Sequence, residues 1–299
     1  MSGERRAPNA ATIAPTDATV LLAVAEGVAV VTLKRPEKLN AFAGDMRERL
    51  VDALDVVVAR ASATGDVRVL VLTGAGKGFC SGGDVQHMLE LKRRGAGFEE
   101  LAPLLEAGRA IVTRLAALEI PVLAAVNGVA AGAGMNLALA CDVRLASSEA
   151  RFGETFVKIG MTPDWGGSYH LPRLVGSAAA LDLCWSGELI DAGEALRLGL
   201  VEHVYPAAEF GAAWRAYAAR LAAAPTTSVR AIKQAMRAAG GRTLVACLDA
   251  EAEAQATCWA SADSGEGLAA FVEKRAARFG AGAVEDGARP PSAAARRFE

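Results

Sequence analysis

Two short apolar runs constrain the fold of this chain more than any other feature. "VRVLVLTG" (67–74) and "PVLAAVNG" (121–128) are almost continuously apolar, and each ends at a glycine. Such runs are typical of strands that are buried on both faces of a sheet. A third strand is expected at "VRLAS" (143–147), and residues 43–61 and 99–118 have helical periodicity. The sequence therefore predicts an α/β body in which strands and helices alternate.

The pattern changes after about residue 177, where strand signals give way to helical ones. A hairpin is expected near the start of the chain, at residues 20–33, whereas the last third reads as helices at 207–221, 228–239, 244–260 and 265–278. We therefore predict a flexible tail over 1–18, an α/β core over 19–205, a C-terminal helical part over 206–279 and a second flexible tail over 280–299.

The composition excludes several classes of protein. The chain is 52% hydrophobic and 22% charged with a net charge of -2, which is an ordinary globular profile without the basic excess of a nucleic-acid-binding protein. Its apolar runs fall short of the roughly 18 to 20 residues that span a bilayer, and no signal peptide is recognisable. The five cysteines and three histidines lack the spacing of disulfide or metal sites. We expect a cytoplasmic protein without a metal, a nucleic-acid partner or a membrane partner.

The glycine-rich loop "GAGKGFCSGGD" (74–84) follows a predicted strand, yet it fits no nucleotide-binding motif. A dinucleotide fingerprint would need a glycine where Phe79 stands, and a phosphate loop would need serine or threonine after glycine-lysine. Ser81 lacks the flanking glycine of a nucleophile elbow, and Cys80 is most simply a small buried hydrophobe. The loop therefore offers a ligand only its backbone.

Two glycine-rich turns, Gly82-Gly83 and Gly132-Ala133-Gly134, carry no side chain large enough to block a ligand. The second turn opens a predicted helix, whose first N–H groups and dipole favour negative charge. If one N–H from each turn converged on the same oxygen, they would form an oxyanion hole. Close packing of the backbone is the alternative explanation.

One carboxylate, Asp164, stands in an unusual setting within "GMTPDWGG" (160–167). A Pro-Asp pair followed by glycines favours a turn. Apolar neighbours such as Trp165, Met161 and Phe156 would remove water from the carboxylate and raise its pKa. The local sequence therefore allows Asp164 to be a turn residue or a base.

Five segments together resemble the crotonase superfamily of enoyl-CoA hydratases and isomerases. They are "RPEKLNAF", "GKGFCSGGDV", "AVNGVAAGAGMNLALACDVRLAS", "FVKIGMTPDWGGSYHLPRLVG" and "GEGLAAFVEKR", in the family's order and spacing over residues 19–279. The resemblance implies a spiral of ββα units with C-terminal helices, assembled as a homotrimer or a dimer of trimers. It also implies an acyl-CoA thioester substrate, with coenzyme A as part of the substrate and no separate cofactor.

The resemblance also assigns roles to individual residues. The family holds a thioester enolate between two backbone N–H groups, which match Gly83 and Ala133. The matching substrate contacts are Lys38 and Leu39 for the pantetheine and phosphates, Ser81 and Val85 for the adenine, and Phe271 and Lys274 from a C-terminal helix, often that of a neighbouring subunit.

The departures from the family pattern concern the acid/base groups. Hydratases hold a water between two glutamates, and the matching residues here are Asn136 and Phe156. Glu154 is not expected to replace the second glutamate, because two residues along a helix rotate a side chain by about 200°.

Asp164, in contrast, matches the catalytic aspartate of dienoyl-CoA isomerases, of the ring-opening isomerase of phenylacetate breakdown and of a chlorobenzoyl-CoA dehalogenase. The surrounding stretch is most similar to the phenylacetate-pathway type. The resemblance therefore favours a carbon–carbon double-bond isomerase of enoyl-CoA, with Asp164 as proton shuttle and Asn136, Phe156 and Trp165 beside the acyl group. An enoyl-CoA hydratase and a non-catalytic acyl-CoA-binding protein are the alternatives.

Overall fold

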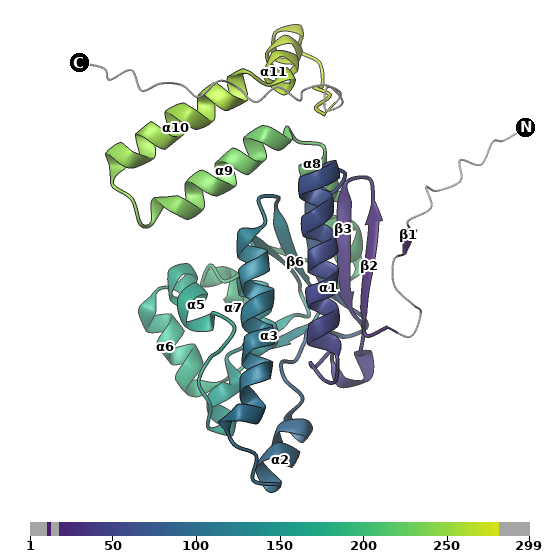
Figure 1. The fold of residues 1–299 in the computed structure, drawn as a ribbon, viewed down its shortest axis with the longest axis vertical. Coiled ribbons are helices and arrows are strands. Elements are labelled where there is room, and N and C mark those ends of the chain that lie inside the picture. The colour runs from purple at the N-terminus through teal and green to yellow at the C-terminus, as the bar shows by residue number, and fades with distance from the viewer. Residues whose placement is uncertain (1–10, 13–17, 281–299) are drawn as a thin grey trace, which may run out of the picture. The chain divides into compact units, whose positions relative to one another are not determined.

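A seven-stranded sheet forms the centre of the first part of the molecule (Figure 1). The computed structural model describes residues 11–12 and 18–280, so most of the two expected tails lies outside the described residues. The hairpin at the start of the sheet agrees with the sequence-based prediction, and the later strands pair in parallel. In spatial order the strands are β1 (Ala11–Thr12), β2 (Val20–Ala25), β3 (Val28–Leu33), β4 (Val69–Gly74), β6 (Val122–Val126), β8 (Val143–Ser147) and β11 (His203–Tyr205).

Strand β4 is buried on both faces, as its apolar run predicted. Val69 and Val71 pack with α8 (Ala207–Ala222) on one side of the sheet. Leu70 and Leu72 belong to the larger core on the other side, where α1 (Met46–Ala59) and α3 (Phe98–Ala117) contribute their apolar faces. Successive side chains of a strand point to opposite faces, so helices on both faces explain the continuous apolar run.

A second sheet has four strands, which alternate along the chain with strands of the first sheet. Its strands are β5 (Gly78–Cys80), β7 (Val129–Ala131), β9 (Arg151–Gly153) and β10 (Ile190–Asp191). Strands β5, β7 and β9 each follow directly on a strand of the first sheet and precede a helix, so the chain repeats a ββα unit. This is the crotonase-like α/β spiral that the resemblance implied, and the fold prediction is confirmed.

The remaining helices connect and cover these sheets. They are α2 (Val85–Arg93), α4 (Ala133–Leu139), α5 (Gly167–Val175), α6 (Ser177–Ser186) and α7 (Ala192–Arg197), with short 3₁₀ helices η1 (Pro36–Lys38) and η3 (Thr155–Ile159) and a π-turn, η2 (Arg60–Thr64), that extends α1.

The chain divides into two compact units after Ala222, one helix later than the predicted boundary at residue 205. The reason lies in α8, whose apolar residues Phe210, Trp214 and Ala218 cover one face of the main sheet. The second unit contains α9 (Thr226–Ala239), α10 (Leu244–Trp259) and α11 (Ala262–Glu273), with α10 in contact with both others.

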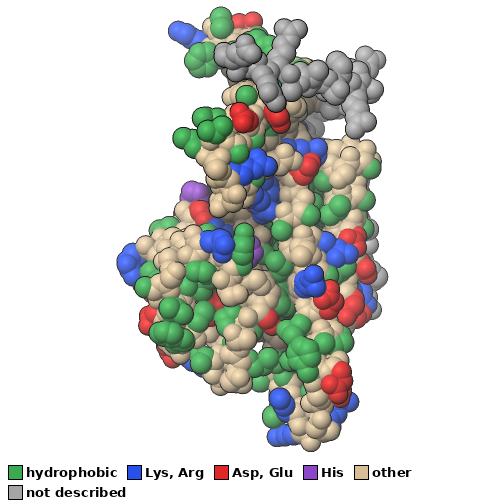
Figure 2. Space-filling model, turned by 60° about the vertical axis from the view of Figure 1, so that its left-hand side comes forward, with side chains coloured by type: hydrophobic (Ala, Val, Ile, Leu, Met, Phe, Trp, Pro, Cys, Tyr) green, Lys and Arg blue, Asp and Glu red, His purple; other side chains and the backbone are tan. Residues whose placement is uncertain are grey.

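The described surface has a mixed distribution of charge. On the face that Figure 2 shows, the described lysine and arginine side chains are interspersed with acidic ones, and they form no broad basic patch. Within the described ranges, no helix is both long and apolar enough to cross a membrane. The same residues contain no group of three or more histidine, cysteine, aspartate and glutamate side chains that could hold a metal ion.

Candidate active site

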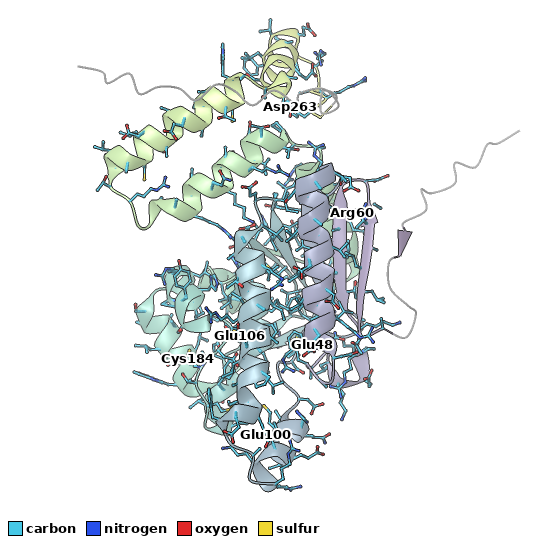
Figure 3. All side chains as sticks on the ribbon, in the orientation of Figure 1. Glu48, Arg60, Glu100, Glu106, Cys184 and Asp263 are labelled. Carbon is cyan, nitrogen blue, oxygen red and sulfur yellow. The ribbon has the colours of Figure 1, made fainter. Side chains whose placement is uncertain are left out.

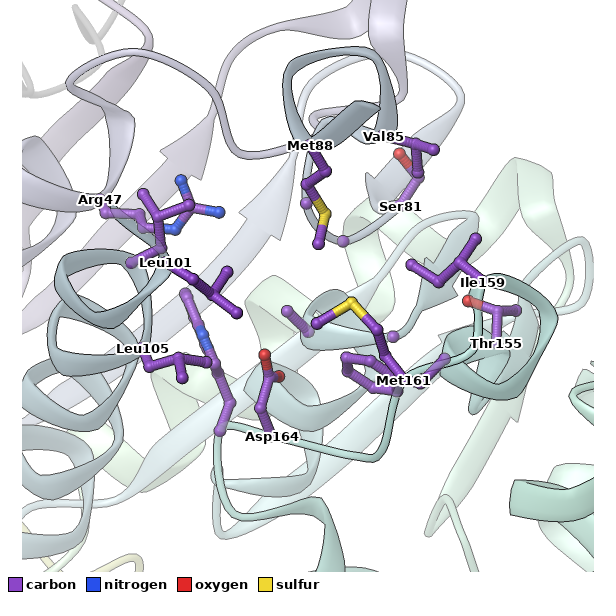
Figure 4. Close-up of a pocket in the computed structure, with 17 residues that line it drawn as sticks. Arg47, Ser81, Val85, Met88, Leu101, Leu105, Thr155, Ile159, Met161 and Asp164 are labelled. Atoms are coloured by element: carbon purple, nitrogen blue, oxygen red, sulfur yellow. The ribbon is translucent and has the colours of Figure 1, made fainter. Parts of the chain in front are cut away.

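A cavity of about 70 Å³ lies between the two glycine-rich turns and the loop that carries Asp164 (Figure 4). Helices α1, α2 and α3 supply one part of its wall, and the start of α4, η3 and the following loop supply the rest. The side chains around it are mostly apolar. Several predicted site residues line it together: Ser81, Gly83, Val85, Ala133, Phe156, Asp164 and Trp165.

Each candidate oxyanion donor follows a glycine with positive φ, Gly82 (φ 95°) before Gly83 and Gly132 (φ 52°) before Ala133. A Cβ atom at Gly82 would lie 2.8 Å from the Ala131 carbonyl oxygen and 3.5 Å from the Ala133 nitrogen. The two turns are therefore direct neighbours, and position 82 requires glycine both for its conformation and for this close approach.

The hydrogen bonds around the turns leave both candidate N–H groups outside the pairing of strands. The Phe42 N–H donates to the Gly82 carbonyl at 2.7 Å, and the Asp84 N–H donates to the Phe42 carbonyl at 3.1 Å. The N–H of Gly83, between them, takes no part in this bridge. Ala133 is the first residue of α4, where helix N–H groups have no intrahelical acceptor. This arrangement can present two donors to one ligand oxygen.

Asp164 is a turn residue through its backbone and a candidate base through its side chain. The Gly167 N–H donates to the Asp164 carbonyl at 2.9 Å. The intervening Trp165 and Gly166 have φ of 47° and 83°, as in a type I′ turn. The carboxylate is directed into the cavity (Figure 4), and its buried Oδ1 has no hydrogen-bond partner among the described residues.

The surroundings of Asp164 tune its basicity. Burial raises the pKa of Asp164 to about 6, and the positive charge of Arg47 opposes this rise. Trp165 is buried, with its ring centroid 4.7 Å from that of Phe42, and forms part of the apolar wall that the sequence predicted. At neutral pH the carboxylate is therefore mostly ionised, yet it is a stronger base than an exposed aspartate.

Glu154 lies outside the cavity lining, although Phe156 two residues later lines it. This agrees with the prediction that the two side chains point in different directions. Glu154 is fully buried at the start of η3, and burial raises its pKa to about 8. It is therefore mostly protonated at neutral pH. Its Oε2 lies 3.5 Å from Asn136 Nδ2.

Other predicted contacts are distributed over the molecule. Asn136 is fully buried and is not one of the described residues that line the cavity; its Nδ2 donates to the Asp164 carbonyl at 2.9 Å and so holds the turn. Lys38 and Leu39 are exposed at the end of η1, and the Ser81 hydroxyl donates to the Lys38 carbonyl at 3.2 Å. These two residues thus adjoin the first glycine-rich turn.

Phe271 and Lys274 belong to the second unit, where Phe271 lies on α11 with 86% of its surface exposed and Lys274 ends that helix. The cavity residues, in contrast, all belong to the first unit.

Sequence reasoning missed Arg47, a buried charge in the cavity wall. It lies on α1 among the buried residues Met46, Leu50 and Leu54. A signal was available, because Arg47 is spaced three and seven residues from Leu50 and Leu54. That spacing places an arginine on the apolar side of a predicted helix, where a charge needs an explanation.

Comparisons with known proteins agree with this architecture. A family model described as enoyl-CoA hydratase/isomerase matches residues 23–282. A Rhodobacter capsulatus protein named "probable enoyl-CoA hydratase" is 43% identical over 87% of this chain and 97% of its own length. The 1,2-epoxyphenylacetyl-CoA isomerase of Escherichia coli is 37% identical with the same coverage. The crystal structure of an enoyl-CoA hydratase from Bacillus anthracis superposes with a TM-score of 0.80 at 32% identity, covering 88% of this chain and 99% of that one. The chain belongs to the enoyl-CoA hydratase/isomerase family of the crotonase superfamily.

Proposed function

We propose that this protein moves a carbon–carbon double bond in an enoyl-CoA thioester, with Asp164 as the proton shuttle. One observation carries the proposal. A buried carboxylate whose Oδ1 has no partner among the described residues shares a small apolar cavity with the two backbone turns of Gly83 and Ala133. A base and two donors for a developing oxyanion are the groups that this isomerisation needs.

The proposed reaction has two proton transfers. Asp164 removes a proton from the carbon between the thioester and the double bond. The carbon–hydrogen bond breaks, and its electron pair moves to the thioester oxygen to form a dienolate. The N–H groups of Gly83 and Ala133 bind that oxygen, and such a donor typically contributes about 10²–10³ in rate. Asp164 then returns the proton at the far end of the dienolate, which leaves the double bond conjugated with the thioester.

A hydratase is the second candidate, favoured by the names of several relatives, including the one that is 43% identical. Hydration requires activation of a water and delivery of a second proton, which usually takes two titratable groups. The resemblance matches the hydratase glutamates to Asn136 and Phe156, and neither side chain takes up a proton at neutral pH. Asp164 is the acid that lines the cavity, and one carboxylate suits isomerisation better.

Asp164→Asn tests the proposal, because asparagine keeps the size of the side chain and removes its basicity. We expect binding of a saturated acyl-CoA to persist, and turnover of 3-enoyl-CoA to fall by about 10²-fold or more. Asp182→Asn, at an exposed position on α6, is the matched control and should leave turnover unchanged.

The assay compares 3-enoyl-, 2-enoyl- and ring-epoxide CoA esters and follows solvent deuterium into the product. If Asp164→Asn isomerises as fast as the parent, the carboxylate is not the base. Hydration of 2-enoyl-CoA that exceeds isomerisation in the parent would favour the hydratase instead. A parent that binds acyl-CoA and turns over none of these esters would favour a non-catalytic binder.

A further inference from the structure

Arg47 is an unusual residue for the wall of an apolar cavity. Its surface is only 7% exposed, and its buried Nε has no hydrogen-bond partner among the described residues. The guanidinium lies over the Phe42 ring, 5.3 Å from the centroid. Its Nη2 would be 3.7 Å from a Cβ atom at Gly83. Arg47 thus places a positive charge beside one of the two candidate oxyanion donors.

A buried charge without hydrogen bonds is costly for a fold. An apolar side chain of similar volume at position 47 would pack in the same stripe of α1 as Leu50 and Leu54 without desolvating a charge. The packing of α1 therefore gives no reason for an arginine here. We therefore expect that Arg47 balances a negative charge in the cavity.

Few acidic groups near Arg47 carry a negative charge at neutral pH. Glu48, next to it on α1 (Figure 3), has an exposed side chain. Burial raises the pKa of the Cys80 thiol to about 12 and that of Glu154 to about 8, so both are mostly neutral. Asp164 remains as the ionised group that lines the same cavity. No hydrogen bond or ion pair joins Asp164 to Arg47 among the described residues, which leaves the carboxylate free to accept a proton.

We propose that the Arg47 guanidinium is the counter-charge for both anions of the reaction, first the Asp164 carboxylate and then the enolate oxygen beside Gly83. This inference rests on the proposed isomerase function. When the proton moves from substrate carbon to Asp164, the negative charge moves from the carboxylate to the thioester oxygen. The net charge of the cavity stays at zero throughout, and Arg47 faces a negative charge before and after the step.

A different role would be the binding of a carboxylate on the acyl group. Charge balance argues against it, because Arg47 and ionised Asp164 already neutralise each other. A second carboxylate would leave one negative charge unbalanced in a site of low polarity. The experiment below separates the two roles.

Arg47→Met removes the charge and keeps an apolar stem, Arg47→Lys keeps the charge, and Glu48→Gln is the control on the neighbouring exposed residue. The ionisation of Asp164 is measured by infrared spectroscopy as the titrating carboxyl band that is missing from Asp164→Asn. In Arg47→Met we expect the pKa of Asp164 to rise by about 1–3 units, since an opposite charge nearby lowers a carboxyl pKa by that much.

Turnover of 3-enoyl-CoA by Arg47→Met at pH 7 should fall at least about 10-fold. The acid limb of its pH profile should move to higher pH by the same amount as the pKa of Asp164. Arg47→Lys should retain most of the parent pKa, and Glu48→Gln all of it.

Three results would overturn the inference. An unchanged Asp164 pKa in Arg47→Met would show that the two groups are not coupled. A fall in melting temperature that accounts for the lost activity would assign Arg47 a structural role. Selective loss of glutaryl-CoA binding relative to pentanoyl-CoA, with the Asp164 pKa unchanged, would make Arg47 a receptor for an acyl carboxylate.

The infrared titration needs no turnover, so it separates this inference from the proposed function. A shifted pKa in a protein that isomerises no enoyl-CoA would refute the isomerase and, with it, the enolate role of Arg47. An unshifted pKa in an active isomerase would refute only the counter-charge.

Discussion

Asp164 closes a tight turn with its backbone while its side chain faces the cavity. Burial raises the pKa of the carboxyl to about 6. Only the ionised form can accept a proton from substrate. We therefore expect kcat/KM for 3-enoyl-CoA to be low at pH 5, to rise with a midpoint near pH 6 and to level off above pH 7. A pH–rate profile with no acid limb between pH 5 and 7 would contradict the role of Asp164 as base.

Glu154 is the buried carboxyl that the proposed mechanism leaves unused. Its folded-state pKa of about 8 lies above the ordinary value of 4.5. The unfolded chain therefore releases this proton at lower pH than the native protein does. The contribution of Glu154 to the free energy of unfolding is therefore fully present below about pH 4.5 and is lost as the pH rises through 8.

Glutamine at position 154 is neutral at every pH. Between pH 4.5 and 8, the free energy of unfolding of Glu154→Gln should therefore fall less than that of the parent. Its turnover should stay within about 3-fold of the parent, because the side chain does not line the cavity. Urea unfolding at several pH values and a 3-enoyl-CoA assay check both outcomes. A variant that loses turnover while remaining folded would identify Glu154 as a second acid/base group and strengthen the hydratase candidate.

The sequence was informative about Asp164 because its signal is local, a Pro-Asp turn next to a tryptophan. The same reasoning missed that Asn136 holds this turn through the Asp164 carbonyl, since the two residues are distant in the chain. Arg47 was overlooked for a similar reason. The cavity that Arg47 shares with Asp164 forms only once α1 and the 160–167 loop are brought together by the fold.

The turn between β5 and α2 packs directly against the backbone that leads into α4, because Gly82 lies against the Ala131 carbonyl. In Gly82→Ala a methyl group would collide with that carbonyl and move the Gly83 N–H. We expect kcat to fall by about 10²-fold, the loss typical of one oxyanion donor.

Gly95→Ala is the matched control. Gly95 also has positive φ (74°), so alanine there costs comparable backbone strain, but no atom lies within 4 Å of the added Cβ. Its kcat should remain within about 2-fold of the parent. Equal losses of kcat in the two variants, measured alongside their melting temperatures, would attribute the Gly82 effect to strain alone.

Long elements were predictable and short ones were not. Helices α1, α3, α9 and α10 extend over enough residues to show a hydrophobic period, and strands β4 and β6 are long enough to be recognised as continuous apolar runs. Strands β5, β7 and β9 are three residues long, too short for any period. They exist because parallel neighbours from distant parts of the chain pair with them, and that pairing is set by the fold.

The sequence places the boundary between the α/β core and the helical part at residue 205, whereas the compact units of the structure separate after Ala222. The change to helical periodicity was visible in the sequence, but the periodicity of α8 does not reveal which of the two compact units its apolar face covers. Phe210 and Trp214 pack on the main sheet, so α8 belongs to the first unit. No comparable burial occurs in the described residues of α9 and α10, which contain no buried side chain.

The second unit exposes several large apolar side chains. Ile232 and Met236, one turn apart on α9, are 59% and 72% exposed, and α10 adds Leu244, Val245 and Leu248. Large exposed apolar patches mark interaction surfaces. We expect these helices to pack between copies of the chain, as a homotrimer or a dimer of trimers, so that light scattering of the parent gives three or six times the chain mass.

Met236→Glu places a charge on this apolar face and should shift the protein toward smaller species at micromolar concentration, because burying an unpaired carboxylate costs several kcal/mol. Thr257→Glu adds the same charge at an exposed position on the opposite side of α10 and is the control. Circular dichroism verifies that both variants keep their helices. A parent that is strictly monomeric at micromolar concentration would contradict the oligomer outright. If instead the parent is oligomeric and Met236→Glu has the same mass, the interface lies elsewhere on the molecule and the exposed face of α9 is not part of it.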